Sequence, residues 1–199
     1  MCGFLVLNEE LSIPEFKLAL KKVYHRGPDN CSATVNNGIC WGFNRLSIMD
    51  LSANGNQPFL YKDYEVVCNG ELYNYPALKE MLKDEYTFKS SSDCEVIIPL
   101  YEKFGIETLC KFLDAEFAFV LYDAKKQSLM AARDPMGIRP MFYGYTKSEH
   151  KISFFHFQIN FTVKMEQLID GFIWSKAIDT TNHIVHFLIN RFFVNRTVG

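Results

Sequence analysis

A cysteine stands at position 2, directly behind Met1, in the opening stretch MCGFLVL. If Met1 is removed, Cys2 carries a thiol and a free α-amine on one residue. An unperturbed thiol has a pKa of about 8.5 and an α-amine one of about 7.7–8.0, so both titrate near neutral pH. This pairing predicts a nucleophilic thiol whose proton the amine can take. The alternative is a small buried residue that begins a first strand.

Four further stretches combine charged, amide and hydroxyl side chains: HRGPD at 25–29, NRLSIMD at 44–50, NGELYN at 69–74 and SDCE at 92–95. Together with the CGF terminus they resemble the glutaminase domain of glutamine-dependent asparagine synthetases. These domains are class II glutamine amidotransferases of the N-terminal-nucleophile hydrolase superfamily. LDAEFAFVLYD and ARDPMGIRPMFYG resemble later strands of that family, so the resemblance runs from Met1 to about Tyr145. HRGPD, NGELYN and SDCE favour the asparagine synthetase branch over the sugar-phosphate and phosphoribosyl amidotransferases.

The resemblance implies a catalytic set of Cys2, Asn69 and Gly70. Cys2 would attack the side-chain amide of L-glutamine and form a γ-glutamyl thioester, releasing ammonia. The Asn69 side-chain amide and the Gly70 backbone N–H would stabilise the negative charge that develops on the carbonyl oxygen. Taken alone, Asn-Gly is also a strong signal for a type I′ hairpin turn, which is the alternative.

Free glutamine is a zwitterion, so its site needs a cation for the α-carboxylate and an anion for the α-ammonium. By resemblance Arg45 binds the carboxylate, which a guanidinium can hold through two parallel hydrogen bonds, and Asp93 binds the ammonium with help from Glu71. The alternatives are a solvated cation at a strand end for Arg45 and a helix N-cap for Asp93, a role that Asp93 could combine with binding. The expected substrate-binding residues are Arg45, Leu46, Ser47, Ile48, Met49, Asn69, Gly70, Glu71 and Asp93.

The histidines give no sign of a metal site. We interpret His25 as a structural hydrogen-bonding residue in a loop that shapes the site, because a role as base would duplicate the terminal amine. His183 and His186 are three residues apart and could share a helical face, but no further ligands stand at a recognisable spacing. We expect this chain to hold neither a metal ion nor a cofactor, since ATP and Mg²⁺ would belong to a synthetase domain.

The stretches between these motifs predict strands packed against helices. CGFLVLN indicates a buried strand, and IPEFKLALKKVY predicts a helix with Pro14 in its first turn. GICWGFNRLSIMD and YEVVCNGELYNY are β-rich, and YPALKEMLKDEY predicts an amphipathic helix with Asn74 as its N-cap. SSSDCEVIIPLYEKFG predicts a capped helix that stops at Gly105.

The later part of the resembling region predicts a hairpin and a further strand. AEFAFVLYDAKKQSLMAARD alternates well enough for two strands that turn near residues 124–127, and PMGIRPMFYGY predicts a loop leading to a strand. The order of elements indicates the α+β class. The resemblance implies a four-layer α/β/β/α sandwich of two antiparallel sheets.

Composition excludes several other classes of function. The net charge of −2 gives no basic surface for nucleic acid, and no apolar run approaches the length of a membrane span. The start lacks a basic region and is followed by Glu9 and Glu10, which argues against a signal peptide. The six cysteines show no CxxC spacing, so we expect free thiols and a cytoplasmic protein.

The expected organisation is a glutamine amidotransferase type 2 domain over residues 1–145, followed by a divergent stretch over 146–199. That stretch is either the rest of the domain or an aberrant tail. The Ser-Gly-Gly-x-Asp-Ser loop of the asparagine-forming half does not occur, and the sequence contains no Gly-Gly pair. We therefore expect a glutaminase without its synthetase domain, whose partners are L-glutamine and a separate synthetase polypeptide or a second copy. A non-catalytic glutamine-binding module and an inactive fragment are the alternatives.

Overall fold

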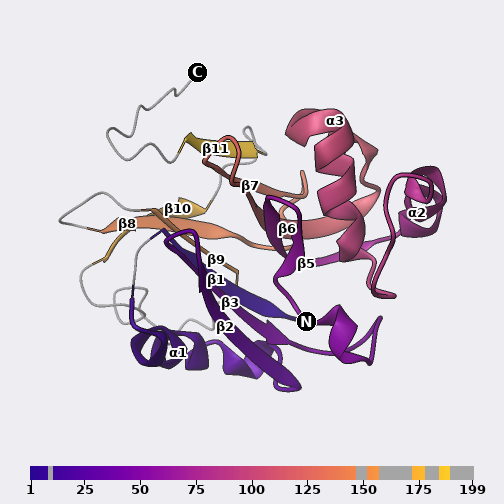
Figure 1. Cartoon of the computed structure of the whole chain (residues 1–199). Coiled ribbons are helices and arrows are strands. Elements are labelled where there is room, and N and C mark those ends of the chain that lie inside the picture. The colour runs from indigo at the N-terminus through magenta and orange to yellow at the C-terminus, as the bar shows by residue number, and fades with distance from the viewer. Residues whose placement is uncertain (9–10, 147–151, 157–171, 178–183, 189–199) are drawn as a thin grey trace.

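Two antiparallel sheets face each other, and helices cover their outer faces (Figure 1). The computed structural model describes residues 1–8, 11–146, 152–156, 172–177 and 184–188, with side chains described up to residue 143. In spatial order, the first sheet contains β10 (Phe172–Ala177), β8 (Phe142–Thr146), β9 (Ile152–His156), β1 (Gly3–Leu7), β3 (Ile39–Arg45) and β2 (Asn30–Asn36). The second contains β11 (Ile184–Leu188), β7 (Ser128–Arg133), β6 (Ala115–Asp123), β5 (Tyr64–Leu72) and β4 (Phe59–Tyr61).

Three α-helices and three 3₁₀ turns complete the described structure. They are α1 (Ile13–Lys21), α2 (Tyr75–Leu82), α3 (Ile97–Phe112), η1 (Tyr24–Arg26), η2 (Ala53–Gly55) and η3 (Cys94–Val96). Helix α1 begins where predicted, because Ser12 and Glu15 form a capping box and Pro14 stands in the first turn.

The hydrophobic core is divided into three layers of side chains, which gives four layers of backbone. Helix α1 packs Phe16 and Leu20 against the outer face of the first sheet. Trp41 and Phe43 from the first sheet meet Val67 and Val120 from the second in the central layer. The outer face of the second sheet packs against α2 and α3. This arrangement confirms the expected α/β/β/α sandwich.

The predicted hairpin is confirmed, with β6 and β7 joined by a turn over residues 124–127. The Asn69–Gly70 pair lies inside β5, opposite Ala118 and Phe117 of β6, so the hairpin-turn alternative for this pair is wrong. Both residues therefore lie on a strand that is paired along its length. This pairing fixes the directions of the Asn69 side chain and the Gly70 backbone more tightly than a turn would.

Two predicted helix ends differ in detail from the structure. Asn74 occupies the N-cap position of α2, but its side chain makes no capping bond and instead bonds the backbone of Phe112 and Asp114. Gly105 breaks the helical backbone of α3 at φ 76°, yet helical structure resumes and continues to Phe112. A residue without a side chain tolerates this left-handed conformation, so Gly105 acts here as a kink instead of a stop.

The described parts of residues 146–199 add strands to both sheets. Strand β9 pairs with β1, β10 with β8, and β11 with β7. His186 lies on β11 and not on a helix, whereas His183 lies outside the described residues. The boundary at residue 145 and the character of the stretch after it stay predictions.

The described residues contain no group of three or more metal-binding side chains and no helix long and apolar enough to cross a membrane. No disulfide links the six cysteines, all of which lie within the described range.

One carboxyl group is buried between the two sheets. Glu65 on β5 is 2% exposed, and its Oε1 accepts a hydrogen bond of 3.0 Å from the Asn36 side chain on β2. Its second oxygen is buried without a partner among the described residues. Burial raises the pKa of Glu65 to about 7 because the charged form loses its hydration.

Replacing Glu65 by Gln should remove a pH dependence of stability. The folded carboxyl has a pKa of about 7 against an ordinary value of 4.5, so the folded state binds the proton more tightly and the free energy of unfolding falls as pH rises between these values. Glu65→Gln carries no charge to bury and should be more stable than the native chain by on the order of 2 kcal/mol at pH 8, but about equal at pH 5. Urea unfolding at both pH values measures this, with the exposed Glu80→Gln as control. An equal gain at both pH values would contradict it.

Candidate active site

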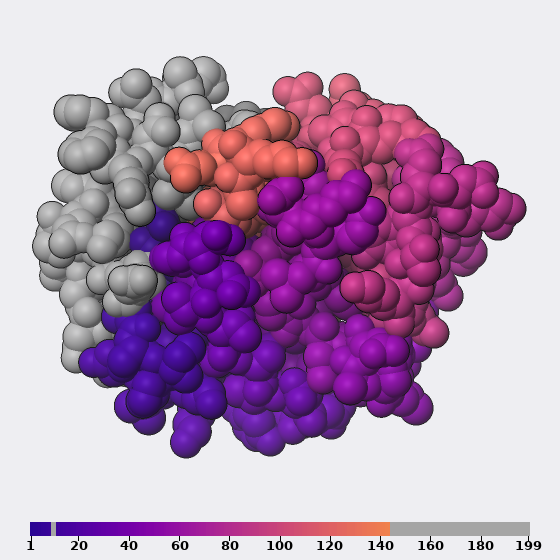
Figure 2. Space-filling view, viewed as in Figure 1, coloured from indigo at the N-terminus to yellow at the C-terminus, as the bar shows by residue number. Residues whose placement is uncertain are grey.

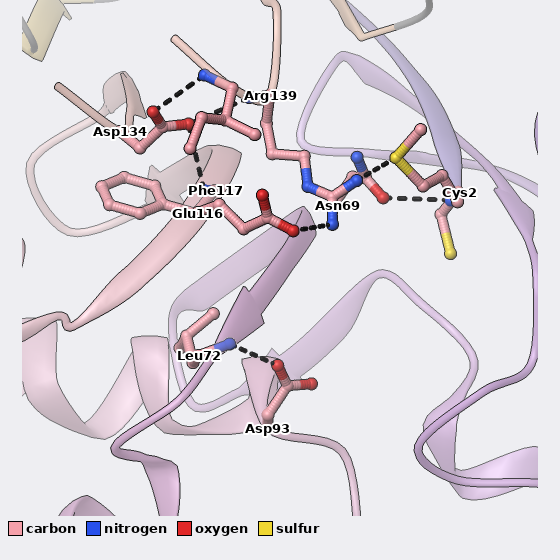
Figure 3. Close-up of polar contacts among 10 residues, drawn as sticks. Cys2, Asn69, Leu72, Asp93, Glu116, Phe117, Asp134 and Arg139 are labelled. Atoms are coloured by element: carbon pink, nitrogen blue, oxygen red, sulfur yellow. Dashed lines mark hydrogen bonds and ion pairs between the residues drawn. The ribbon is translucent and has the colours of Figure 1, made fainter. Parts of the chain in front are cut away.

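Cys2 is held between the two sheets, just ahead of β1 (Figure 3). Its backbone nitrogen donates a 3.0 Å hydrogen bond to Oδ1 of Asn69 on β5. Its Sγ accepts a hydrogen bond from the backbone N–H of Leu46 at 3.3 Å. The pairing of Gly3 with Asn44 in the β1–β3 ladder brings Cys2 beside the chain that leaves β3. Cys2 does more than fill the core, which was the alternative, because its half-buried thiol also lines a cavity.

Burial controls the ionisation of the Cys2 thiol. Loss of hydration raises the pKa of this thiol, and the Leu46 N–H bond opposes the rise by favouring the thiolate. Burial lowers the pKa of the terminal amine on Met1, with Arg26 and Arg139 adding to the effect. A thiol with a raised pKa needs a neighbouring base, and an amine with a lowered pKa is a better proton acceptor at neutral pH than an ordinary one.

The Asn69 amide has a defined orientation. Its Oδ1 accepts the hydrogen bond from Cys2, so Oδ1 faces Cys2 and the donor Nδ2 faces the other way. Gly70 follows on the same strand, and a Cβ there would lie 2.9 Å from the Glu116 carbonyl oxygen and 3.0 Å from Cβ of Phe117. The close approach of β6 thus requires a residue without a side chain at position 70.

Arg45, the last residue of β3, is buried, so the alternative of a solvated strand-end cation is wrong. Its Nη1 donates to the Ser52 carbonyl oxygen at 2.7 Å and to Oδ1 of Asn56 at 2.8 Å, and its Nη2 donates to the Asp50 carbonyl oxygen. The guanidinium therefore holds the loop after β3 in a closed turn. Gly55 lies against it, since a Cβ there would be 2.2 Å from Nη2.

Asp93 and Glu71 supply negative charge on the far side of the cavity. Asp93 is 3% exposed, and its Oδ2 accepts a 2.8 Å hydrogen bond from the backbone of Leu72. It occupies the N-cap position of η3, as the alternative has it, but its side chain makes no capping bond there. Figure 3 shows its other oxygen directed away from Leu72. Burial and then the charge of Asp93 raise the pKa of Glu71.

A cavity of about 70 Å³ brings the predicted residues together. Charged side chains line it from separate strands and loops, among them the predicted Arg45, Glu71 and Asp93. Of the predicted wall, Ser47 does not line the cavity; its backbone N–H donates instead to Asp29 of HRGPD at 2.7 Å. The predicted residues that do line it are Cys2, Arg45, Leu46, Ile48, Met49, Asn69, Gly70, Glu71 and Asp93.

The loop HRGPD has the shaping role expected of it. Asp29 holds the backbone of Ser47, and a Cβ at Gly27 would lie 2.2 Å from the Asn44 carbonyl oxygen. His25 is exposed on η1 and does not line the cavity. The loop acts through its backbone packing and through Asp29.

Gln57 and Arg139 also line the cavity, although the sequence did not single them out. The Gln57 side chain accepts from the Cys68 N–H at 2.6 Å and donates to the Cys68 carbonyl oxygen at 3.0 Å, which pairs it with β5 as a strand would pair.

On the surface, the segment before β8 (orange) lies against violet and purple surface from the chain's first third (Figure 2). Only the folded chain brings position 139 next to position 2.

Arg139 is fixed by two carboxylates. Its backbone N–H donates to Asp134 at 3.0 Å, and Asp134 also accepts from the N–H groups of Ile138 and Phe117, which organises the loop (Figure 3). Its Nη2 forms a 2.5 Å ion pair with Glu116 on β6. The guanidinium thereby stands between Glu116 and the amino terminus.

The chain matches a family model described as "Glutamine amidotransferase domain" over residues 1–193. It is 43% identical to amidase chry2 of Gibberella zeae over 144 residues, which is 69% of this chain and 21% of that protein. It is 39% identical to a probable glutamine-hydrolysing asparagine synthetase of Acanthamoeba polyphaga mimivirus (77% of this chain, 29% of that protein) and 40% identical to asparagine synthetase 2 of Bacillus subtilis (77% and 21%). The chain thus spans between a fifth and a third of the length of these relatives.

Solved structures share the fold at low sequence identity. Glutamine phosphoribosylpyrophosphate amidotransferase from B. subtilis superposes with a TM-score of 0.66 at 19% identity, over 78% of this chain and 41% of that one. The chain therefore has the N-terminal-nucleophile hydrolase fold.

Replacing Gly55 by Ala should displace Arg45 from its loop acceptors. The added methyl would overlap Nη2 of Arg45 and lie 2.9 Å from Cβ of Asp50, both in a tightly packed turn. We expect a loss of about 1–3 kcal/mol in the free energy of unfolding, typical of overpacking. Urea unfolding measures it, and the exposed Asn54→Ala in the same turn serves as control. A Gly55→Ala chain as stable as this control would show that the turn is looser than described.

Proposed function

Because the chain belongs to the glutamine amidotransferase domain family, we propose that it hydrolyses L-glutamine to glutamate and ammonia with Cys2 as the nucleophile. One observation carries the proposal: the Cys2 nitrogen, which becomes the terminal amine when Met1 is removed, is already bonded to Asn69 at 3.0 Å. The same residue's thiol lines a cavity that carries Arg45 and Asp93. Nucleophile, base and charged anchors for an amino acid thus lie within one cavity.

The chemistry begins with the Cys2 amine taking the proton of the Cys2 thiol. The thiolate attacks the side-chain carbonyl carbon of glutamine, and the C=O electron pair moves to oxygen. Nδ2 of Asn69 and the N–H of Gly70 donate to this oxyanion. As the C–N bond breaks, the ammonium of Cys2 returns the proton to the leaving nitrogen, and ammonia departs from a γ-glutamyl thioester.

Water completes the cycle by hydrolysing the thioester. The neutral amine of Cys2 takes a proton from water, whose oxygen attacks the thioester carbonyl. The C–S bond then breaks, the sulfur recovers its proton, and glutamate leaves. The raised pKa of the thiol supports a need for this base, since little thiolate forms at neutral pH without one.

Charge complementarity accounts for recognition of a free amino acid. In the proposed pose Arg45 binds the α-carboxylate, while Asp93 and Glu71 bind the α-ammonium. Leu46, Ile48 and Met49 form the wall beside the side chain, with Ser47 turned to Asp29. Buried charges of fixed position recognise a zwitterion with little reorganisation.

We propose further that the ammonia serves the amidation of aspartate in asparagine biosynthesis. The relatives that carry the name asparagine synthetase support this destination. In such proteins ATP and Mg²⁺ would act in a synthetase region, which supplies the activated aspartate. The motifs of this chain provide the ammonia-releasing half of that reaction.

Cys2→Ser should abolish glutamine hydrolysis in a chain whose Met1 has been removed. Intact mass of the trimmed native protein should gain one adduct with the glutamine-like electrophile 6-diazo-5-oxo-L-norleucine, and Cys2→Ser none. Cys31→Ser, at an exposed cysteine, should retain both activity and adduct. A trimmed native chain that binds glutamine in calorimetry without forming glutamate would instead identify a non-catalytic binding module.

Asn69→Ala should lower kcat by roughly 10²–10³-fold, the usual effect of removing one oxyanion donor. KM should change far less, because the donor acts mainly on charge that appears in the transition state. Asn74→Ala is the matched control: its side chain bonds backbone groups of Phe112 and Asp114 and lies outside the cavity. Glutamate formation at varied glutamine concentration separates the two parameters, and an unchanged kcat for Asn69→Ala would exclude this residue from the oxyanion site.

A further inference from the structure

Arg139 is a buried cation, and the hydrogen bonds that organise its loop do not explain where its side chain lies. Its backbone is fixed by Asp134, and its Nη2 by Glu116 at 2.5 Å. Its Nε is buried with no partner among the described residues, and its Nη1 contacts the sulfur of Met1. Burying a guanidinium with an unpaired nitrogen is costly, so a folding role alone explains this arrangement poorly.

The ion pair points its positive end at the amino terminus. Figure 3 shows the order Glu116, Arg139, then Cys2, with Asn69 beside the guanidinium, and Nη1 of Arg139 contacts the Met1 sulfur. A charge pair with this orientation raises the electrostatic potential at the terminus even though its net charge is zero. Removal of Met1 takes away the residue that separates the guanidinium from the nitrogen of Cys2.

The charged groups around the terminus come from several parts of the chain. Burial is the largest effect that lowers the pKa of the Met1 amine; Arg26 on η1 and Arg139 before β8 lower it further, whereas the Cys2 thiol and Asp29 raise it. Glu116 on β6 faces Arg139, and Glu71 and Asp93 lie across the cavity. The nitrogen of Cys2 itself is bonded to the uncharged Asn69, so long-range charge and burial decide its protonation.

We propose that Arg139 is a positioning residue for the hydrolysis: held by Glu116 beside the amino terminus, it keeps the α-amine of mature Cys2 neutral, ready to take the thiol proton. The inference rests on the proposed function, because a neutral amine matters only if Cys2 is the nucleophile. Arg139 acts through Cys2 and does not contact the reacting atoms.

The test compares pH profiles of kcat/KM for glutamine in trimmed chains. Arg139→Met removes the cation and should move the acidic limb to higher pH by about half a unit to one unit, as expected for a charge several ångströms away in a partly screened site. At pH 6 its kcat should fall several-fold, and at pH 9 it should approach the native value with KM unchanged. Arg139→Lys should restore much of the native profile.

Glu116→Gln should shift the acidic limb of the kcat/KM profile in the direction opposite to that of Arg139→Met. Loss of its negative charge should move the acidic limb to lower pH, which a merely structural role would not do. Arg133→Met is the control, because Arg133 is buried near the same loop but does not line the cavity. A loss of activity equal at every pH, a rise in KM alone, or shifts of the same sign for Arg139→Met and Glu116→Gln would overturn the proposal.

A second measurement reads the amine without turnover. In a Cys2→Ser background, the rate of N-terminal acylation by acetic anhydride as a function of pH gives the amine pKa, followed by mass spectrometry of the terminal peptide. Arg139→Met should raise that pKa and Glu116→Gln should lower it. Such shifts, found together with a trimmed native chain that forms no glutamate, would uphold the effect of Arg139 on the amine while refuting the proposed function. An unmoved pKa would refute the role of Arg139 itself.

Discussion

A single hydrogen bond, from the Cys2 nitrogen to the Asn69 side-chain oxygen, joins the two sheets at the place where the chemistry is proposed to occur. Cys2 precedes β1 of the first sheet, and Asn69 lies on β5 of the second. Their separation is therefore set by how the sheets pack, through a central layer that includes Trp41 and Val67. The core fixes the distance between the proposed nucleophile and the proposed oxyanion donor, so a change in the packing between the sheets is also a change in the candidate active site.

The charged side chains of the cavity are fixed before any substrate arrives. Arg45 is saturated on one side by carbonyl oxygens of the loop that it closes, and Asp93 holds the backbone of Leu72. Each charge is thus buried with hydrogen bonds that offset its lost hydration. A site built in this way binds with little loss of side-chain freedom, because its rotamers are already restricted by the loops they support.

Much of the fold followed from local patterns, whereas the details of the site did not. The capping box at Ser12 and the β6–β7 hairpin are short-range features that a sequence expresses directly. The strand position of Asn69 followed only from its neighbours in NGELYN, because the dipeptide alone favours a turn. Arg139 and Gln57 escaped prediction since their partners are set by tertiary contacts, across more than a hundred residues for Arg139. Ser47 lies outside the cavity for a related reason: its backbone N–H donates to Asp29, which comes from a different loop.

The contact between the Met1 side chain and Arg139 places the start residue at the mouth of the cavity. In the proposed mechanism the nitrogen of Cys2 must be a free amine, which it is not while Met1 is attached. On that mechanism, an aminopeptidase of the host would decide how many molecules are competent, and the specific activity of a preparation would report the fraction processed. Affinity tags fused ahead of Met1 would lengthen the obstruction, so a purification handle belongs at the other end of the polypeptide.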